Sequence, residues 1–133
     1  MAAPIPTDII VAARENAASG QAMGALPDLL KTIALNNKLD ESREFATYVQ
    51  RAMIEKLRVS NKAVKDLGVR QAPFMVLIGA AMPSVLAEIS FVTSASEVKL
   101  LKQPAYRQRI AEALFDAVRR YQGSLKRVAA PVA

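Results

Sequence analysis

One carboxylate in this chain stands where it could do acid–base chemistry. Glu88 is the only acidic residue between Leu67 and Ala95, and most of its neighbours are apolar. Burial in such a stretch disfavours the charged form of a carboxyl group and so makes it a usable general base near neutral pH. The alternatives are a pairing with a cation, a bond to a backbone amide, or a glutamate that points into solvent. Glu88 is therefore a candidate catalytic residue.

The residue types that are missing exclude several classes of site. The 133 residues contain no histidine, cysteine or tryptophan. Without cysteine there is no disulfide framework, zinc finger or thiol nucleophile, and without histidine there is no Ser-His-Asp triad or imidazole ligand for zinc. Ser84 has no base to activate it and is interpreted as a turn residue. Asn16, Asn36 and Asn37 are interpreted as helix caps and turns.

The net charge of +6 lies entirely at one end of the chain. Residues 1–98 carry ten basic and ten acidic side chains, whereas residues 99–133 carry eight basic and two acidic ones. A basic segment can attract nucleic acid, an anionic membrane surface or an anionic polymer. The simpler interpretation is a solvated helix face, because the basic residues alternate with acids and no motif that reads nucleic acid is present.

Helical periodicity and capping residues predict five helices. We expect them over residues 8–18, 29–36, 40–59, 94–101 and 104–124. The third is amphipathic, with a stripe of apolar residues at helical spacing: Phe45, Val49, Ala52, Met53 and Leu57. The last has a similar stripe: Tyr106, Ile110, Ala113, Leu114, Ala117, Val118 and Tyr121. Its outer face pairs Asp116 with Arg120, four residues apart. The sequence Ser94-x-x-Glu97 predicts a capping box at the start of the fourth helix.

Two apolar runs between these helices predict strands. Phe74–Ile78 is bounded by Pro73 and Gly79, and Ser84–Val92 follows Pro83. Runs that are apolar on both faces are typical of parallel strands covered by helices on both sides. The predicted fold class is therefore α/β, a partial three-layer fold with two parallel strands of a larger sheet and about five flanking helices. Two strands are too few for a stable sheet of their own.

The domain organisation follows from these elements. We expect an irregular start over residues 1–8, one α/β region over residues 9–124 and a basic, flexible tail over residues 125–133. No signal peptide is visible, and the longest mostly apolar stretch is too short and too interrupted by proline to span a bilayer, which takes about 20 residues.

The apolar runs also carry a family resemblance. Phe74-Met75-Val76-Leu77 followed by Met82–Val92 resembles the last two strands of the zinc-dependent N-acetylmuramoyl-L-alanine amidases of the Amidase_3 type, which act on peptidoglycan. The segment from Glu97 through Pro104-x-Tyr106-Arg107 to Tyr121 resembles the closing helix of that family. The resemblance runs from about Val11 to Tyr121.

This resemblance implies a metal-assisted amide hydrolysis. In such enzymes a zinc ion held by His, Glu and His activates a water that attacks the amide between N-acetylmuramic acid and L-Ala. A glutamate on the last strand acts as general base, and the matching position here is Glu88. The family works in the bacterial periplasm or outside the cell, and its partner is peptidoglycan.

The missing histidines set this chain apart from the family. The family's zinc ligands lie in its first half, so the chain resembles the carboxyl-terminal half of an amidase domain, and an amino-terminal half is a possible missing partner. We expect no zinc at a catalytic site in this chain and no activity of the chain alone. The alternative function is a non-catalytic basic module that binds cell-wall polymer or a protein partner. Neither nucleic acid nor a membrane is an expected partner.

Overall fold

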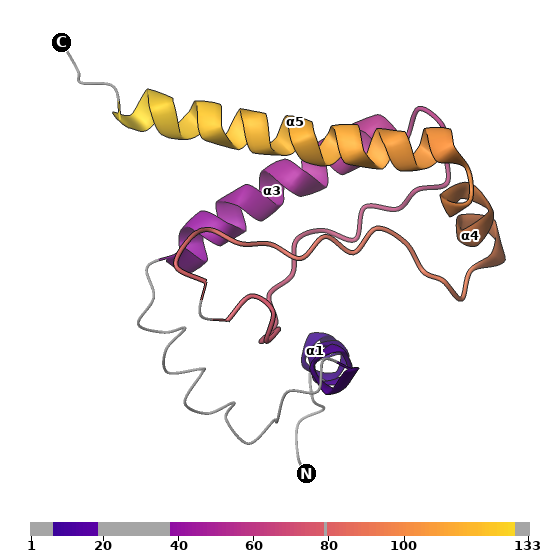
Figure 1. Ribbon diagram of the computed structural model, residues 1–133, viewed down its shortest axis with the longest axis horizontal. Coiled ribbons are helices and arrows are strands. Elements are labelled where there is room, and N and C mark those ends of the chain that lie inside the picture. Colours follow the sequence, from indigo (N-terminus) through magenta and orange to yellow (C-terminus); the bar gives the residue numbers. More distant parts are fainter. Residues whose placement is uncertain (1–6, 19–37, 79, 130–133) are drawn as a thin grey trace. The chain divides into compact units, whose positions relative to one another are not determined.

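The computed structural model describes residues 7–18, 38–78 and 80–129 (Figure 1). Four helices lie in these ranges: α1 (Thr7–Ala18), α3 (Lys38–Leu57), α4 (Ala95–Leu101) and α5 (Pro104–Ala129). The helix predicted over residues 29–36 lies outside the described residues, as do Asn36 and Asn37. The chain forms two compact units, one of Met1–Arg43 with Val69–Val85 and one of Glu44–Gly68 with Leu86–Ala133.

In the first unit, one buried amide ties α1 to a segment far along the chain. Asn16 is 2% exposed. Its Nδ2 donates to the carbonyl oxygen of Pro73 at 3.0 Å, and its Oδ1 accepts the backbone N–H of Met75 at 2.8 Å. The interpretation of Asn16 as a cap or turn residue was wrong, because its side chain bonds the backbone of a distant segment.

The predicted α/β fold is wrong for the residues that the structure describes, which contain helices and irregular segments but no strand. Phe74–Ile78 folds into turns, in which the N–H groups of Leu77 and Ile78 donate to the carbonyl of Phe74 at 3.0 and 3.2 Å. Residues 84–92 have no neighbouring strand among the described residues.

The physical reason lies in what a strand requires. A strand needs a neighbour to accept and donate its backbone hydrogen bonds, and an apolar composition supplies none. Nor are these runs buried on both faces, as the strand prediction assumed. Val76 is 74% exposed, Phe91 59% and Val92 80%.

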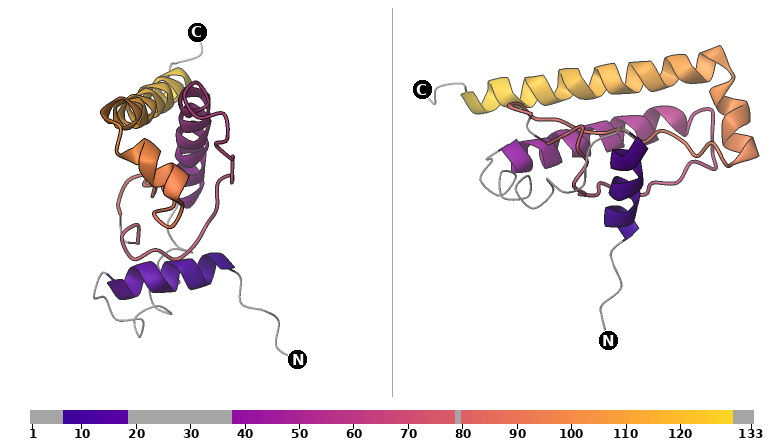
Figure 2. Two further views of the ribbon diagram at one scale, coloured as in Figure 1. Left: turned by 90° about the vertical axis from the view of Figure 1, so that its right-hand side faces the viewer. Right: turned by 60° about the horizontal axis from the view of Figure 1, so that its bottom comes forward.

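In the second unit, the apolar stripes of α3 and α5 form the core. The buried residues of α3 are Val49, Ala52, Met53 and Leu57, and those of α5 are Tyr106, Ile110, Ala113, Ala117 and Tyr121. These are most of the residues that helical periodicity selects, while Val118 is exposed. The two views in Figure 2 show the two helices side by side.

Aromatic contacts fix one end of this helix pair and a polar contact lies near the other. The rings of Phe45 and Tyr121 stack with centroids 4.9 Å apart, and Tyr48 lies 5.9 Å from Tyr121. Asn61, four residues beyond the end of α3, donates to the hydroxyl of Tyr106 near the start of α5, at 3.5 Å. The two helices are therefore antiparallel.

Proline and serine set the boundaries of the last two helices. Pro104 is the first residue of α5, as predicted. Ser94 precedes α4 with an extended backbone but makes no capping hydrogen bond through its side chain, so the predicted capping box does not form. α5 continues to Ala129, past Ser124 where its end was expected.

Candidate functional site

Glu88 lies in the irregular segment that precedes α4, in the second unit. Its side chain is exposed, and so are the neighbouring Leu86 and Ile89, at 42% and 40%. It makes no hydrogen bond or ion pair with any residue that the structure describes. Glu88 is therefore not buried by its apolar neighbours. Its side chain is exposed to solvent, which was one of the alternatives considered for it.

A second glutamate anchors the backbone close to Glu88. Oε2 of Glu97 accepts the N–H of Phe91 at 2.7 Å, and the N–H of Ser94 donates to the carbonyl of Phe91 at 3.0 Å. A hydrogen bond from a backbone N–H to a carboxylate is stronger than one to a neutral oxygen acceptor. Glu97 therefore holds the segment three residues after Glu88 against the first turn of α4, while the Glu88 side chain stays accessible.

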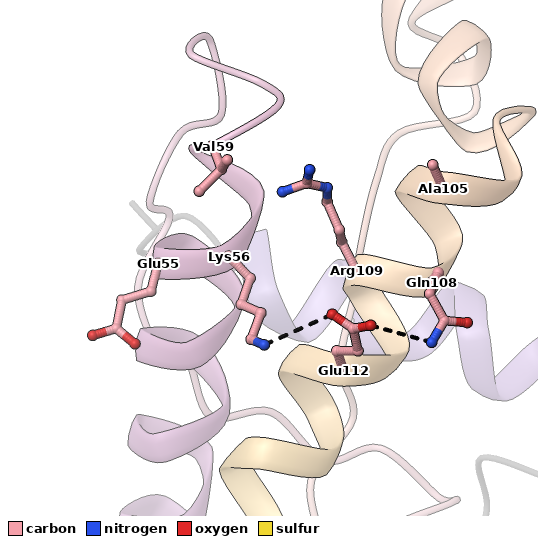
Figure 3. Close-up of a pocket in the computed structure, with 7 residues that line it drawn as sticks. All are labelled: Glu55, Lys56, Val59, Ala105, Gln108, Arg109 and Glu112. Atoms are coloured by element: carbon pink, nitrogen blue, oxygen red, sulfur yellow. Dashed lines mark hydrogen bonds and ion pairs between the residues drawn. The ribbon is translucent and has the colours of Figure 1, made fainter.

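An open groove of about 570 Å³ lies between α3 and α5 in the same unit (Figure 3). Five of its seven lining residues are charged or polar: Glu55, Lys56, Val59, Ala105, Gln108, Arg109 and Glu112 line it. Figure 3 shows Lys56 and Gln108 directed toward the two oxygens of Glu112. The distances are 3.8 Å from Lys56 Nζ and 3.3 Å from Gln108 Nε2.

Ion pairs connect the two helices of this pair. Lys56 Nζ lies 3.0 Å from Asp116, and Arg120 lies 2.9 Å from Glu55. The predicted Asp116–Arg120 pair is replaced by these two contacts with α3. The hydrogen bond from Lys56 is the largest cause that lowers the pKa of the Asp116 carboxyl. The groove thus presents charges that are paired between the two helices, and none of its lining residues is an activated nucleophile.

The residues present do not fit a zinc ion. Among the described residues, no three His, Cys, Asp or Glu side chains lie together as a metal would need. The whole sequence has no histidine or cysteine, the ligands that most zinc sites use. Asp116 and Glu112 face Lys56, which competes with a cation for the same oxygens.

Two structural roles were missed by the sequence analysis. Lys56 bridges two acids of α5, and Asn16 joins α1 to residues 57 and 59 positions later. Lys56 lies beside the apolar stripe of α3, a position from which a long side chain can reach a partner helix. For Asn16, a single sequence contains no signal of so distant a contact.

The comparison with known families decides the ancestry of the chain. The family model described as N-acetylmuramoyl-L-alanine amidase, Amidase_3, matches residues 10–120. This chain belongs to that family. The match includes Glu88 and all of the groove residues, and it confirms the family that the sequence resemblance indicated.

Individual amidases give the same result. A cell wall amidase of Bacillus anthracis, itself uncharacterised, is 34% identical over 116 residues, which are 86% of this chain and 21% of that protein. The amidase AmiA of Escherichia coli is 34% identical over 94 residues, 71% of this chain and 29% of AmiA. LytC of Bacillus subtilis is 40% identical over 62 residues, 47% of this chain and 12% of LytC.

The match covers a minor part of these amidases. The chain spans about 12 to 29% of their length. No solved structure gives a significant match. Among the described residues, no helix has the length and apolar character to cross a membrane.

Proposed function

We propose that this amidase-family chain takes part in hydrolysing the amide bond between N-acetylmuramic acid and L-Ala of peptidoglycan. The observation that carries the proposal is the family match over residues 10–120, which extends through the Glu88 segment. The place of action is then the bacterial cell wall, in the periplasm or outside the cell, where peptidoglycan lies.

In this proposal Glu88 is the general base. An exposed carboxylate without a competing cation can reach a substrate and accept a proton from an attacking water molecule. It can then return the proton to the nitrogen of the leaving amine. Glu97 holds the neighbouring backbone through the N–H of Phe91, which keeps the base in place relative to α4.

The family resemblance implies that the reaction uses a zinc ion. We propose that the ligands of this ion come from residues that this chain does not supply. The absence of histidine and cysteine from the sequence supports this division. Catalysis by the chain alone is therefore not expected. The amidase reaction would need the metal-binding part of a family member together with the Glu88 segment.

A chimera tests this division of labour. Residues 10–120 replace the matching region of Escherichia coli AmiA, and the purified chimera and the isolated chain are each supplied with zinc and peptidoglycan. The readout is release of stem peptides, measured by chromatography. We expect release by the chimera and none by the isolated chain.

Two outcomes contradict the proposal. Peptide release by the isolated chain would show that the zinc-binding part is not needed. A chimera that folds and binds zinc but releases no peptide would show that this chain cannot supply the missing function. Circular dichroism and metal analysis of the chimera separate the second outcome from a failure to fold.

A further inference from the structure

The long helix α5 has a second apolar face that the core of the second unit does not use. Phe115 is 63% exposed, Val118 40% and Leu125 45%. Spacings of three and seven residues place these side chains on the same side of a helix. They span residues 115–125, a rise of about 15 Å along the helix at 1.5 Å per residue. α5 therefore presents a narrow apolar ridge, Phe115–Val118–Leu125, to solvent.

The acids of α5 form ion pairs with α3, whereas two cations beside the ridge form no ion pair with a described residue. The two acids of α5, Glu112 and Asp116, are both engaged by Lys56 of α3. Arg119 and Lys126 follow the ridge seven residues apart, and neither forms an ion pair with a described residue. Arg119 lies over the ring of Phe115, 5.8 Å from its centroid. The ridge is thus flanked by two cations, while Glu112, on the same side of α5 as Arg119, is engaged by Lys56 of α3.

We propose that this ridge docks an acidic amphipathic helix of a partner protein. Apolar residues of such a helix at helical spacing would cover Phe115, Val118 and Leu125, while carboxylates on its flank would face Arg119 and Lys126. A partner of about three turns matches the length of the ridge. The sequence analysis named a module that binds a protein partner as the alternative function. This proposal gives that function a binding surface and a type of partner, and it does not depend on amidase activity.

Other occupants fit the ridge less well. A second copy would bring Arg119 and Lys126 toward like charges, which is unfavourable. A polyanion would use the cations but not Phe115 or Leu125. A lipid surface requires a broad apolar face, whereas the broad face of α5 is buried in the core of the unit.

A synthetic peptide tests the proposal with the full chain. The probe is a fluorescent 18-residue acidic peptide with leucines along one helical side and glutamates beside them, and binding is followed by fluorescence anisotropy. We expect binding at 0.1 M salt that weakens about tenfold or more in each of two double variants. These are Phe115→Ser with Leu125→Ser, and Arg119→Gln with Lys126→Gln.

Matched controls use exposed residues away from the ridge. Val92→Ser removes an apolar side chain that is 80% exposed, and Arg51→Gln removes an exposed cation of α3. Both controls should bind the peptide like the parent, and circular dichroism should show the same helix content in all variants. Binding that is lost equally in the controls would overturn the proposal.

Three further outcomes also overturn it. The first is no peptide binding by a folded chain. The second is peptide binding that the Phe115 and Leu125 substitutions leave unchanged, which indicates charge attraction alone. The third is a ridge that is occupied by something else, seen as Phe115-dependent dimers in sedimentation or as Phe115-dependent binding to phosphatidylglycerol vesicles without binding to the peptide.

Discussion

At the scale of the residue, the two most informative side chains have opposite environments. Glu88 is an exposed carboxylate that makes no contact with a described charged group, whereas Asn16 is almost fully buried and uses both ends of its amide. Exposure suits a group that must meet a substrate, and burial suits a group that holds two segments together. In the proposed function, chemistry and stability therefore depend on different polar residues in this chain.

Asn16→Ala should lower the free energy of unfolding by about 2–3 kcal/mol. Two hydrogen bonds are lost, and the carbonyl of Pro73 and the N–H of Met75 are left without their partner. Urea unfolding followed by circular dichroism measures the change. Glu15→Ala, at the exposed neighbouring position of α1, is the control and should change stability by less than about 0.5 kcal/mol. Equal effects of the two substitutions would contradict the role given to Asn16.

At the scale of the element, the α3–α5 pair combines an apolar core with ion pairs at its edge. The ring of Tyr121 lies against Phe45 and Tyr48, and Lys56 reaches the acids on the neighbouring helix. The burial of apolar area supplies most of the stability of such a pair, while exposed ion pairs supply little. The two kinds of contact should therefore respond differently to substitution.

Tyr121→Ala should be strongly destabilising, by about 3–5 kcal/mol, because it leaves a cavity beside two aromatic rings. Tyr121 is 6% exposed, whereas Phe115 on the same helix is 63% exposed. Phe115→Ala is therefore the matched control and should change the unfolding free energy by less than about 0.5 kcal/mol. Thermal or urea unfolding distinguishes them, and a reversed order would show that α5 packs through its other face.

The Lys56–Asp116 pair predicts a pH dependence. The hydrogen bond from Lys56 lowers the pKa of Asp116 in the folded chain. A carboxyl whose pKa is lowered by folding stabilises the chain above its unfolded pKa, and this contribution is lost as the pH falls through the folded pKa. We expect the unfolding free energy to decrease between about pH 5 and pH 2, with a smaller decrease in Lys56→Gln.

A nuclear magnetic resonance titration of the Asp116 carboxyl carbon measures this effect directly. The pKa of Asp116 should rise in Lys56→Gln and stay as in the parent in Lys62→Gln. Lys62 is exposed and forms no ion pair with a described residue, so it serves as the control. If Lys56→Gln leaves the titration of Asp116 unchanged, the ion pair does not persist in solution.

At the scale of the whole molecule, the helices of the described residues and the family could be predicted from the sequence, whereas the prediction of two strands was wrong. Helical periodicity selected Val49, Met53 and Leu57 because a helix satisfies its own backbone and needs only one apolar side. The apolar run Phe74–Ile78 could not be assigned in the same way, since a strand forms only where a neighbouring strand pairs with its backbone. Asn16 was misread for a related reason, because its partners lie more than fifty residues away.

For the candidate site, the sequence indicated a residue but not its environment. Composition singled out Glu88 as the lone acid of its region, and the match to the amidase family extends over this region. Exposure could not be predicted, because it depends on the packing of segments that are distant in sequence. The general-base role of Glu88 therefore stays a prediction that activity must test.

The rate of peptide release by the AmiA chimera tests that role most directly. We predict that Glu88→Gln lowers the rate about 100-fold or more, because the amide of glutamine cannot accept the proton. Glu44→Gln, at an exposed position of α3, should leave the rate unchanged. A folded, zinc-loaded Glu88→Gln chimera that releases peptides at the rate of the parent chimera would contradict the central claim.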